Sequence, residues 1–380
     1  MTQLLILGGG ALGCAVAAYL AERPDWQGRI QGLERDPSYA QASSALSAAS
    51  IRQQFSTPLN IALSQFGLQV LRAAGPAAAL VERGYLYLAG PAQASALAAL
   101  QAEQQRLGAP VRLLDRAALQ ARWPWLQLDD IELGCWGEQG EGWFDGWGLL
   151  MSLRARARAA GVEFLQGEAQ QLERHADGSL AAVHSSLGRL EAERFVLACG
   201  AWSAPLAATA ALDIPISARR RSVYAFHSPE AAPLAPLLID PSGLWFRPEG
   251  EAGQFICGGT PLDDTPGLPL DPEADLFEQH LWPALAARVP GFESLRPGRA
   301  WAGYYEMNDF DHNGLVGALD ECPNLLMACG FSGHGLQHAP GVGRGLAEWL
   351  ATGGYETLDL SPLSPERLRR GQRYLERNVI

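Results

Sequence analysis

The sequence has no long apolar run, no closely spaced pair of cysteines and no cluster of metal-ligating residues. Although 48% of its 380 residues are hydrophobic, no run is long enough to cross a membrane, so we expect no transmembrane segment. The six cysteines are scattered without a CxxC pair, which favours a reducing compartment over a disulfide framework or a zinc site. The chain opens directly on an apolar strand without an export or transit leader, and we therefore predict a cytoplasmic protein without a metal site.

Positive charge is also scarce. The sequence has 29 Lys and Arg residues against 41 Asp and Glu residues, which gives a net charge of −12. A surplus of this sign disfavours nonspecific binding to nucleic acid or to anionic lipid. At 380 residues, the chain is long enough for about two domains, each with a core of its own.

The first 36 residues carry the pattern around which the chain is organised. An apolar run over residues 4–7 ends in Gly-x-Gly-x-x-Gly at Gly8, Gly10 and Gly13, and a helix-like apolar spacing follows. This order predicts a strand, a tight turn and a helix. Gly8 permits the turn, Gly10 lets a pyrophosphate approach the backbone, and Gly13 lets the helix pack closely on the strand. The free N–H groups of the helix N-terminus would then face the phosphates.

A second apolar run completes this dinucleotide unit. Residues 30–33 end in Glu34, whose carboxylate is placed to accept hydrogen bonds from both adenosine ribose hydroxyls. The neighbouring Arg35 would suit a ribose 2′-phosphate, but Glu34 would repel one, so NADP is disfavoured. The pattern alone leaves NAD and FAD open.

Beyond this unit, the hydrophobic periodicity changes along the chain. Residues 57–75 begin with Thr-Pro, which is typical of a helix start. Residues 113–147 are rich in Trp and Gly and are predicted to form turns. Residues 214–301 form short runs with a period near two, which predicts an antiparallel sheet interrupted by one helix over residues 272–289.

Two later segments each run from an apolar strand into a glycine, at residues 195–202 and at residues 325–335. Open α/β sheets bind ligands at the carboxyl ends of their strands. A glycine loop before a helix also aims backbone N–H groups at an anionic group. Both segments are therefore expected to reach the bound dinucleotide.

Four blocks match one family in order: the dinucleotide unit with Glu34, residues 43–55, residues 198–202 and residues 330–344. Together they resemble the D-amino acid oxidase superfamily of FAD enzymes, in the branch of sarcosine oxidase, glycine oxidase and D-amino acid dehydrogenases. The resemblance is closer still to an FAD-dependent oxidoreductase related to the mitochondrial complex I assembly flavoprotein. The strings that carry it are residues 42–47, 51–56, 301–305, 330–337 and 378–380.

The resemblance implies an α/β fold whose second domain is α+β. A discontinuous Rossmann-like FAD-binding domain is expected over residues 1–84, 146–213 and 303–380, and an antiparallel β-sheet substrate domain over residues 85–145 and 214–302. The resemblance also favours FAD over NAD as the cofactor. The residues expected to contact FAD are Gly8, Gly10, Ala11, Leu12, Gly13, Glu34, Arg35, Ser43, Ser44, Ser47, Cys199, Gly200, Trp202, Gly303, Gly333, His334, Gly335, Leu336 and Gln337.

The match also predicts how the cofactor is held. Where sarcosine oxidase attaches its flavin through a cysteine, this chain has Gly303, and residues 43–50 contain no histidine for the alternative linkage. FAD is therefore expected to bind noncovalently. His334 is expected to meet the cofactor mostly through its backbone.

The candidate catalytic residues are Arg52, Arg221, Tyr305 and Gln337. A substrate carboxylate calls for a guanidinium, which can hold both oxygens. Arg52 matches the carboxylate-binding arginine of sarcosine oxidase, with a structural salt bridge as its alternative, and Arg221 resembles an arginine of a D-arginine dehydrogenase type. Gln337 and Tyr305 stand where those relatives have lysine and arginine, which weakens the positive charge of the pocket.

The resemblance implies that a C–N bond of an amino acid or a secondary or N-methyl amine is oxidised to an imine, by hydride transfer to flavin N5. The electron acceptor would be O₂, a quinone or an electron-transfer protein. A lysine that activates oxygen in the relatives is replaced here by Ile256, which favours a dehydrogenase over an oxidase. The alternative is a flavin-binding assembly or interaction protein with little turnover.

Overall fold

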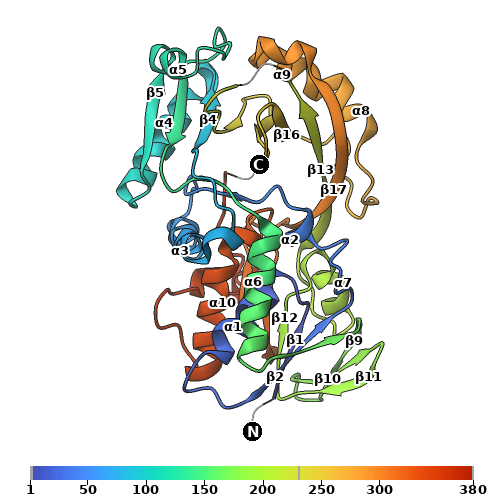
Figure 1. The fold of residues 1–380 in the computed structure, drawn as a ribbon. Helices are drawn as coiled ribbons and strands as arrows, with labels where there is room; N and C mark the ends of the chain where they lie inside the picture. Colours follow the sequence, from blue (N-terminus) through green and yellow to red (C-terminus); the bar gives the residue numbers. More distant parts are fainter. Residues whose placement is uncertain (1–2, 230–231, 379–380) are drawn as a thin grey trace.

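The computed structural model describes residues 3–229 and 232–378, which form two lobes stacked along one axis (Figure 1). The lower lobe contains the first strand and the first helix of the chain, and the two longest strands belong to the upper lobe. The described range leaves out residues 1–2 and residues 379–380. The latter two belong to the string 378–380 that carries part of the resemblance.

A six-stranded sheet forms the centre of the lower lobe. Neighbouring strands are parallel except for the β18–β19 pair at one edge. Strands covered on both faces need continuous apolar runs, and β1 supplies one. In spatial order the strands are β18 (Leu315–Leu319), β19 (Cys322–Cys329), β12 (Arg194–Leu197), β1 (Gln3–Leu7), β2 (Arg29–Glu34) and β8 (Glu163–Gln166).

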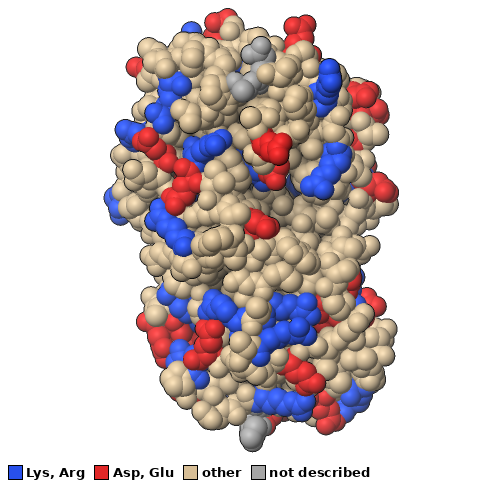
Figure 2. All heavy atoms as spheres, in the orientation of Figure 1, with Lys and Arg blue, Asp and Glu red and all other residues tan. Residues whose placement is uncertain are grey.

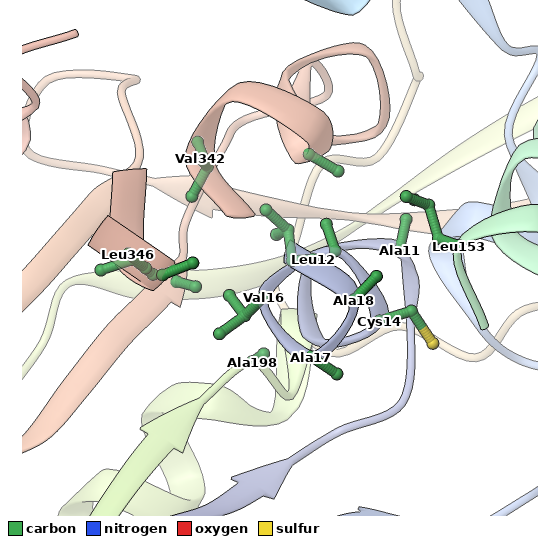
Figure 3. Packing of buried hydrophobic residues seen from close by; sticks show 14 of the residues in the cluster. Ala11, Leu12, Cys14, Val16, Ala17, Ala18, Leu153, Ala198, Val342 and Leu346 are labelled. Atoms are coloured by element: carbon green, nitrogen blue, oxygen red, sulfur yellow. The ribbon is translucent and has the colours of Figure 1, made fainter. Parts of the chain in front are cut away.

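Helix α1 (Ala11–Ala21) is buried between two other helices (Figure 3). Val342 of α10 (Gly335–Thr352) packs against one side and Leu153 of α6 (Gly146–Ala159) against the other. Nine of the 11 residues of α1 are buried, as expected for a helix that is apolar all round. This packing fixes the N-terminus of α1 at the carboxyl end of the sheet.

An eight-stranded sheet forms the upper lobe, and all of its pairings are antiparallel except β14 with β4. This confirms the predicted antiparallel sheet. Its two longest strands, β13 and β17, run down toward the lower lobe (Figure 1). In spatial order the strands are β17 (Arg296–Asn308), β13 (Ile216–His227), β16 (Gln254–Gly258), β15 (Trp245–Pro248), β14 (Leu237–Ile239), β4 (Tyr85–Ala89), β6 (Leu133–Gly137) and β5 (Val111–Asp115).

Smaller elements complete both lobes. The predicted helix start at Thr-Pro is confirmed, since Thr57 is the N-cap of α3. The helices are α2 (Ser43–Leu46), α3 (Pro58–Ala74), α4 (Pro91–Arg106), α5 (Arg116–Arg122), α7 (Ser203–Ala208), α8 (Ala274–Leu276), α9 (Trp282–Arg288) and α11 (Glu366–Arg369). The strands are β3 (Ser50–Ile51), β7 (Gly142–Trp143), β9 (Ala169–Arg174), β10 (Leu180–Ser185) and β11 (Gly188–Glu191). The short 3₁₀ or π turns are η1 (Gly75–Ala77), η2 (Gly200–Trp202), η3 (Phe277–Leu281), η4 (Pro290–Ser294) and η5 (Ser361–Leu363).

Two expectations from the sequence need correction. The single helix over residues 272–289 is instead α8, a π turn and α9, because Pro283 has no N–H to continue the α-helical ladder. Residues 113–147 contain α5 and β6 as well as turns. The glycines of β6 have low strand propensity, so the sequence did not predict this strand. It forms because β6 pairs with β4 on one side and with β5 on the other.

Acidic and basic side chains are interspersed on the face shown in Figure 2, and basic side chains gather around the position of α6. Arg154 of this helix lies against the rings of Tyr39 (5.5 Å) and Phe164 (5.3 Å), while Arg156 pairs with Glu22 at 2.7 Å. Within the described residues, no helix has both the length and the apolar composition needed to cross a membrane.

Candidate functional site

A cavity of about 840 Å³ runs from the carboxyl ends of β1, β2 and β12 to the underside of the eight-stranded sheet. We call the end at Glu34 the floor and the end under the upper sheet the roof. The floor is lined by Gly8, Gly10, Ala11, Leu12, Glu34, Arg35 and Tyr39. The roof is lined by Tyr87, Arg221, Trp245, Tyr304 and Tyr305.

The glycine turn of the floor has the geometry that its spacing predicts. Gly8 has a φ of +99°, and a Cβ there would lie 2.3 Å from the Ala198 carbonyl oxygen. A Cβ on Gly13 would lie 2.0 Å from the Gly8 carbonyl oxygen, so this glycine allows α1 to pack on the turn without lining the cavity itself. Among the described residues no side chain caps α1, and its first turn holds no acid, which leaves its N–H groups available to an anion.

Glu34 is fixed at the end of β2 by the main chain. Its Oε2 accepts the Gly9 N–H at 2.7 Å and its Oε1 accepts the Asp36 N–H at 2.9 Å. Each carboxylate oxygen keeps a further lone pair for a ribose hydroxyl. Beside it, the Arg35 guanidinium lies 3.8 Å from the centre of the Trp202 ring, so both residues form one flat wall.

The serine segment lies between floor and roof. Ser43, Ser44 and Ser47 all line the cavity, and the Ser43 hydroxyl donates to the Tyr304 carbonyl at 2.7 Å. A Cβ on Gly303 would lie only 3.1 Å from the Leu46 Cβ, so a glycine here lets α2 approach β17. Cys199, Gly200 and Trp202, which follow β12, line the same stretch.

The loop after β19 brings Gly333, His334, Gly335, Leu336 and Gln337 to the cavity. The His334 side chain is 3% exposed, and neither ring nitrogen has a partner in the described part of the chain. Burial, with a smaller contribution from the charge of Arg52, lowers the pKa of His334 to about 3. The imidazole is therefore neutral at ordinary pH and has both nitrogens available to a bound molecule.

Of the two predicted carboxylate-binding arginines, Arg221 lines the roof. Its guanidinium carbon is 5.1 Å from the centre of the Tyr305 ring. Nη1 donates to Asp264 Oδ1 at 2.5 Å and to the Arg220 carbonyl at 2.9 Å. Since the arginine and Asp264 are both partly exposed, this pair holds Arg221 only weakly.

Arg52 lies behind the cavity wall and does not line it. The side chain is 4% exposed and donates to the carbonyls of Gln54 (2.6 Å) and Asn378 (2.5 Å). Its guanidinium carbon also lies 3.9 Å from the centre of the Phe55 ring. These contacts favour a structural role for Arg52, although its partners are backbone carbonyls and not the carboxylate of a salt bridge.

Gln337 links Arg52 to the cavity. Its Oε1 accepts the Arg52 backbone N–H at 2.9 Å, which leaves the amide NH₂ group for a ligand. Ile256 is buried in β16 and does not line the cavity.

Several polar cavity residues escaped the sequence-based prediction, among them Tyr39, Tyr87, Glu306 and Asn378. The hydroxyls of Tyr39 and Tyr87 are buried and have no partner among the described residues. Glu306 was detectable in principle, since it is an acid directly after the predicted Tyr305 in a strand that ends in the cavity. No sequence signal placed the other three there.

These groups fit a dinucleotide cofactor: an open helix N-terminus, a fixed carboxylate and buried hydroxyls without partners. A profile of the family described as FAD dependent oxidoreductase (DAO) matches residues 3–349. The chain belongs to this family. Its cofactor is accordingly FAD, which confirms the choice over NAD.

Two relatives match this chain over its whole length. The FAD-dependent oxidoreductase domain-containing protein 1 of Xenopus laevis is 36% identical over 423 residues, covering 100% of this chain and 85% of the relative. The protein of the same name from Bos taurus is 37% identical, with 100% and 87% covered. Both full-length matches confirm the resemblance.

Solved structures confirm the fold. The L-proline dehydrogenase from P. horikoshii superposes with a TM-score of 0.88 at 23% identity, covering 98% of this chain and 99% of that one. Glycine oxidase from Geobacillus kaustophilus gives a TM-score of 0.82 at 22% identity, with 96% and 98% covered. The predicted α/β fold with an FAD-binding half and an antiparallel second sheet is thus confirmed.

Proposed function

We propose that this protein oxidises a C–N bond of an amino acid or of a secondary or N-methyl amine to an imine. The observation that carries the proposal is the continuity of the cavity: the floor that suits FAD opens into a roof where Arg221 stands beside Tyr305. The names of the solved relatives, an L-proline dehydrogenase and a glycine oxidase, support an amino-acid substrate.

The roof residues would orient the substrate. Arg221 would exchange Asp264 for the substrate carboxylate, because a guanidinium can hold two carboxylate oxygens at once. The Gln337 NH₂ group and the unpartnered His334 imidazole would meet the remaining polar atoms. His334 stays neutral, so it can accept a hydrogen bond from the amine without a charge that would repel an ammonium ion.

FAD, bound noncovalently in this proposal, supplies the acceptor for the hydride that leaves the substrate carbon. The protein contributes position and a dry surrounding. Tyr87, Tyr305 and Trp245 line the roof and would keep water from the reacting end once cofactor and substrate are bound. Ile256 stands where the relatives have the lysine that activates oxygen, which favours an electron carrier or a quinone over O₂ as acceptor.

A second candidate is a flavin-binding assembly or interaction protein with little turnover. One observation favours it: both predicted carboxylate binders already have protein partners, Arg52 at two carbonyls and Arg221 at Asp264. A protein of this kind would hold FAD as a structural element.

An anaerobic reduction screen separates the two candidates. The purified flavoprotein is mixed with a panel of amino acids, N-methyl amino acids and simple amines, and the flavin absorbance is followed. Bleaching by at least one amine with formation of the matching imine or carbonyl product supports the proposal. A flavin that dithionite reduces but no member of the panel bleaches would contradict it.

A further inference from the structure

Glu306 is a buried carboxylic acid inside the cavity that has no part in the proposed reaction. Glu306 of β17 is 8% exposed, and it lines the cavity between the glycine loops that follow β12 and β19. Its Oε2 accepts the Gly330 N–H at 2.9 Å. Its Oε1 lies 3.3 Å from the position of a Cβ on Gly335, the first residue of α10. The acid thus faces the space that the cofactor enters.

Three titratable groups lie near Glu306 or line the cavity with it. The thiols of Cys199 and Cys329 are close enough for its charge to affect them, and the imidazole of His334 lies on the loop after β19 and lines the same cavity. Burial raises the pKa of Cys199 to about 12 and that of Cys329 well above its usual value, and it lowers the pKa of His334. All three are neutral at physiological pH, so none of them balances an ionised Glu306.

The arginines of the paired strand β13 and of the cavity floor have other partners. On β13, which pairs with β17, Arg219 bonds Asp309 at 3.1 Å and Arg221 bonds Asp264. Arg35 stacks on the Trp202 ring. Within the described residues, no cation lies within ion-pairing distance of Glu306, whereas the buried Asp311 has Arg367 at 2.7 Å.

The whole cavity is short of positive charge. Its lining holds four acids, Glu34, Asp36, Glu168 and Glu306, against two arginines, Arg35 and Arg221. The sequence contains no lysine, so all 29 basic residues are arginine. FAD brings the negative charges of its pyrophosphate into this space, and helix N-termini are the main groups that can balance them. An ionised carboxylate in the same low-dielectric cavity would repel the cofactor.

We propose that Glu306 is the proton-carrying group of the cofactor site: its carboxyl is neutral in the FAD complex, and binding of FAD at alkaline pH takes up one proton from solvent. The balance is simple, since a carboxylate and a proton become a carboxylic acid and no bond of FAD is made or broken. The neutral acid also leaves the positive end of α10 free to act on the cofactor.

The pKa of Glu306 in the free protein agrees with a carboxyl that is neutral in the FAD complex. Burial raises the pKa of Glu306 to about 7. Because an anionic ligand raises it further, the protonated form binds FAD more tightly. FAD affinity is therefore full below pH 7 and falls as the pH rises above 7.

The chain offers a matched control in Glu141. This acid is fully buried, and burial raises its pKa to about 7 as well. It accepts hydrogen bonds from the Gln53 N–H (2.5 Å) and the Gln54 side chain (2.7 Å), and it lies outside the cavity lining. If any buried acid could take up the proton when FAD binds, replacing either Glu141 or Glu306 would reduce the uptake. If the proton goes to the cofactor site, only replacing Glu306 would reduce it.

Titration calorimetry of FAD into the apoprotein tests the proposal. Runs at pH 8 in two buffers of different ionisation enthalpy give the number of protons taken up. We expect about one proton per FAD for the wild type and for E141Q, and about none for E306Q. Between pH 7 and 9 the Kd for FAD should rise about tenfold per pH unit in the first two proteins and stay flat in E306Q.

Three outcomes overturn the proposal. They are no proton uptake by the wild type, uptake that survives in E306Q, and uptake that is lost in E141Q. If E306Q does not fold, the wild type and E141Q still test the proposal, since it requires the uptake of about one proton in both. No substrate takes part, so failure here is distinct from failure of the proposed amine oxidation.

Discussion

The two ends of the cavity are built by different means. The floor is made mostly of main chain: a glycine turn, the open N-terminus of α1, and Glu34 held by two backbone N–H groups. The roof is made of side chains from separate strands, among them Tyr87, Arg221 and Trp245. A site made of backbone needs glycines at fixed spacing and can be found in a sequence, whereas a site made of side chains depends on long-range packing.

Arg52 and Arg221 show this difference within one residue type. Both were predicted to bind a carboxylate by resemblance. Arg221 reaches the roof, whereas Arg52 turns away from it to two backbone carbonyls. Nothing in the local sequence distinguishes them, because the carbonyl of Asn378 that holds Arg52 lies 326 residues further along the chain.

The largest expected effect is at the floor. In Gly13→Val, the new Cβ would overlap the Gly8 carbonyl oxygen, 2.0 Å away, and push α1 off the turn. We expect a loss of about 1–3 kcal/mol in the free energy of unfolding together with loss of bound FAD. Flavin absorbance per protein and urea denaturation measure both. Gly354→Val is the control, since nothing lies within 4 Å of a Cβ there, and it should keep its flavin.

The next effect separates the two arginines. Arg221→Gln should raise the KM for a carboxylate substrate by about 10²–10³-fold with little change in stability. Arg52→Gln should instead lower the free energy of unfolding by about 1–3 kcal/mol, because the carbonyls of Gln54 and Asn378 lose the hydrogen bonds from a buried guanidinium. Steady-state kinetics and urea denaturation of both variants give the comparison. A large increase in KM for Arg52→Gln, with little change for Arg221→Gln, would show that Arg52 binds the carboxylate instead.

A smaller effect is expected at Glu34. The Glu34→Gln variant keeps the size of the side chain but replaces charged hydrogen bonds to the ribose by neutral ones. The Kd for FAD should rise about tenfold, corresponding to about 1.4 kcal/mol. Substrate KM measured with saturating FAD should not change, and a large change in KM would mean that floor and roof do not act separately.

The smallest effect is expected at Asp264, which occupies Arg221 in the free protein. Asp264→Asn removes a partly exposed ion pair and with it the competition for the guanidinium. The KM for a carboxylate substrate should fall by up to about fivefold. An increase in KM would show that Asp264 positions Arg221 for the substrate and does not compete with it.

Sequence reasoning found the framework of the fold and most of the floor. The glycine spacing gave the β1–α1 turn, and the change of period after residue 214 gave the antiparallel sheet. It missed β6, because glycine has low strand propensity and only its two neighbours make it a strand. It also missed Glu306, since the resemblance ended at Tyr305, one residue earlier. Whether a side chain of the upper sheet lines the roof depends on packing between distant strands, and no local pattern encodes it.

We propose that FAD bound at the floor faces a carboxylate-binding roof at Arg221. Anaerobic stopped-flow reduction of the flavin tests it most directly, with an active N-methyl amino acid compared with the same amine lacking its carboxylate. We predict that the wild type is reduced by the acid at far lower concentration than by the amine, and that Arg221→Gln removes this preference while keeping its FAD. Equal preference in the two proteins, or no reduction of the wild-type flavin by any amine, would overturn this proposal.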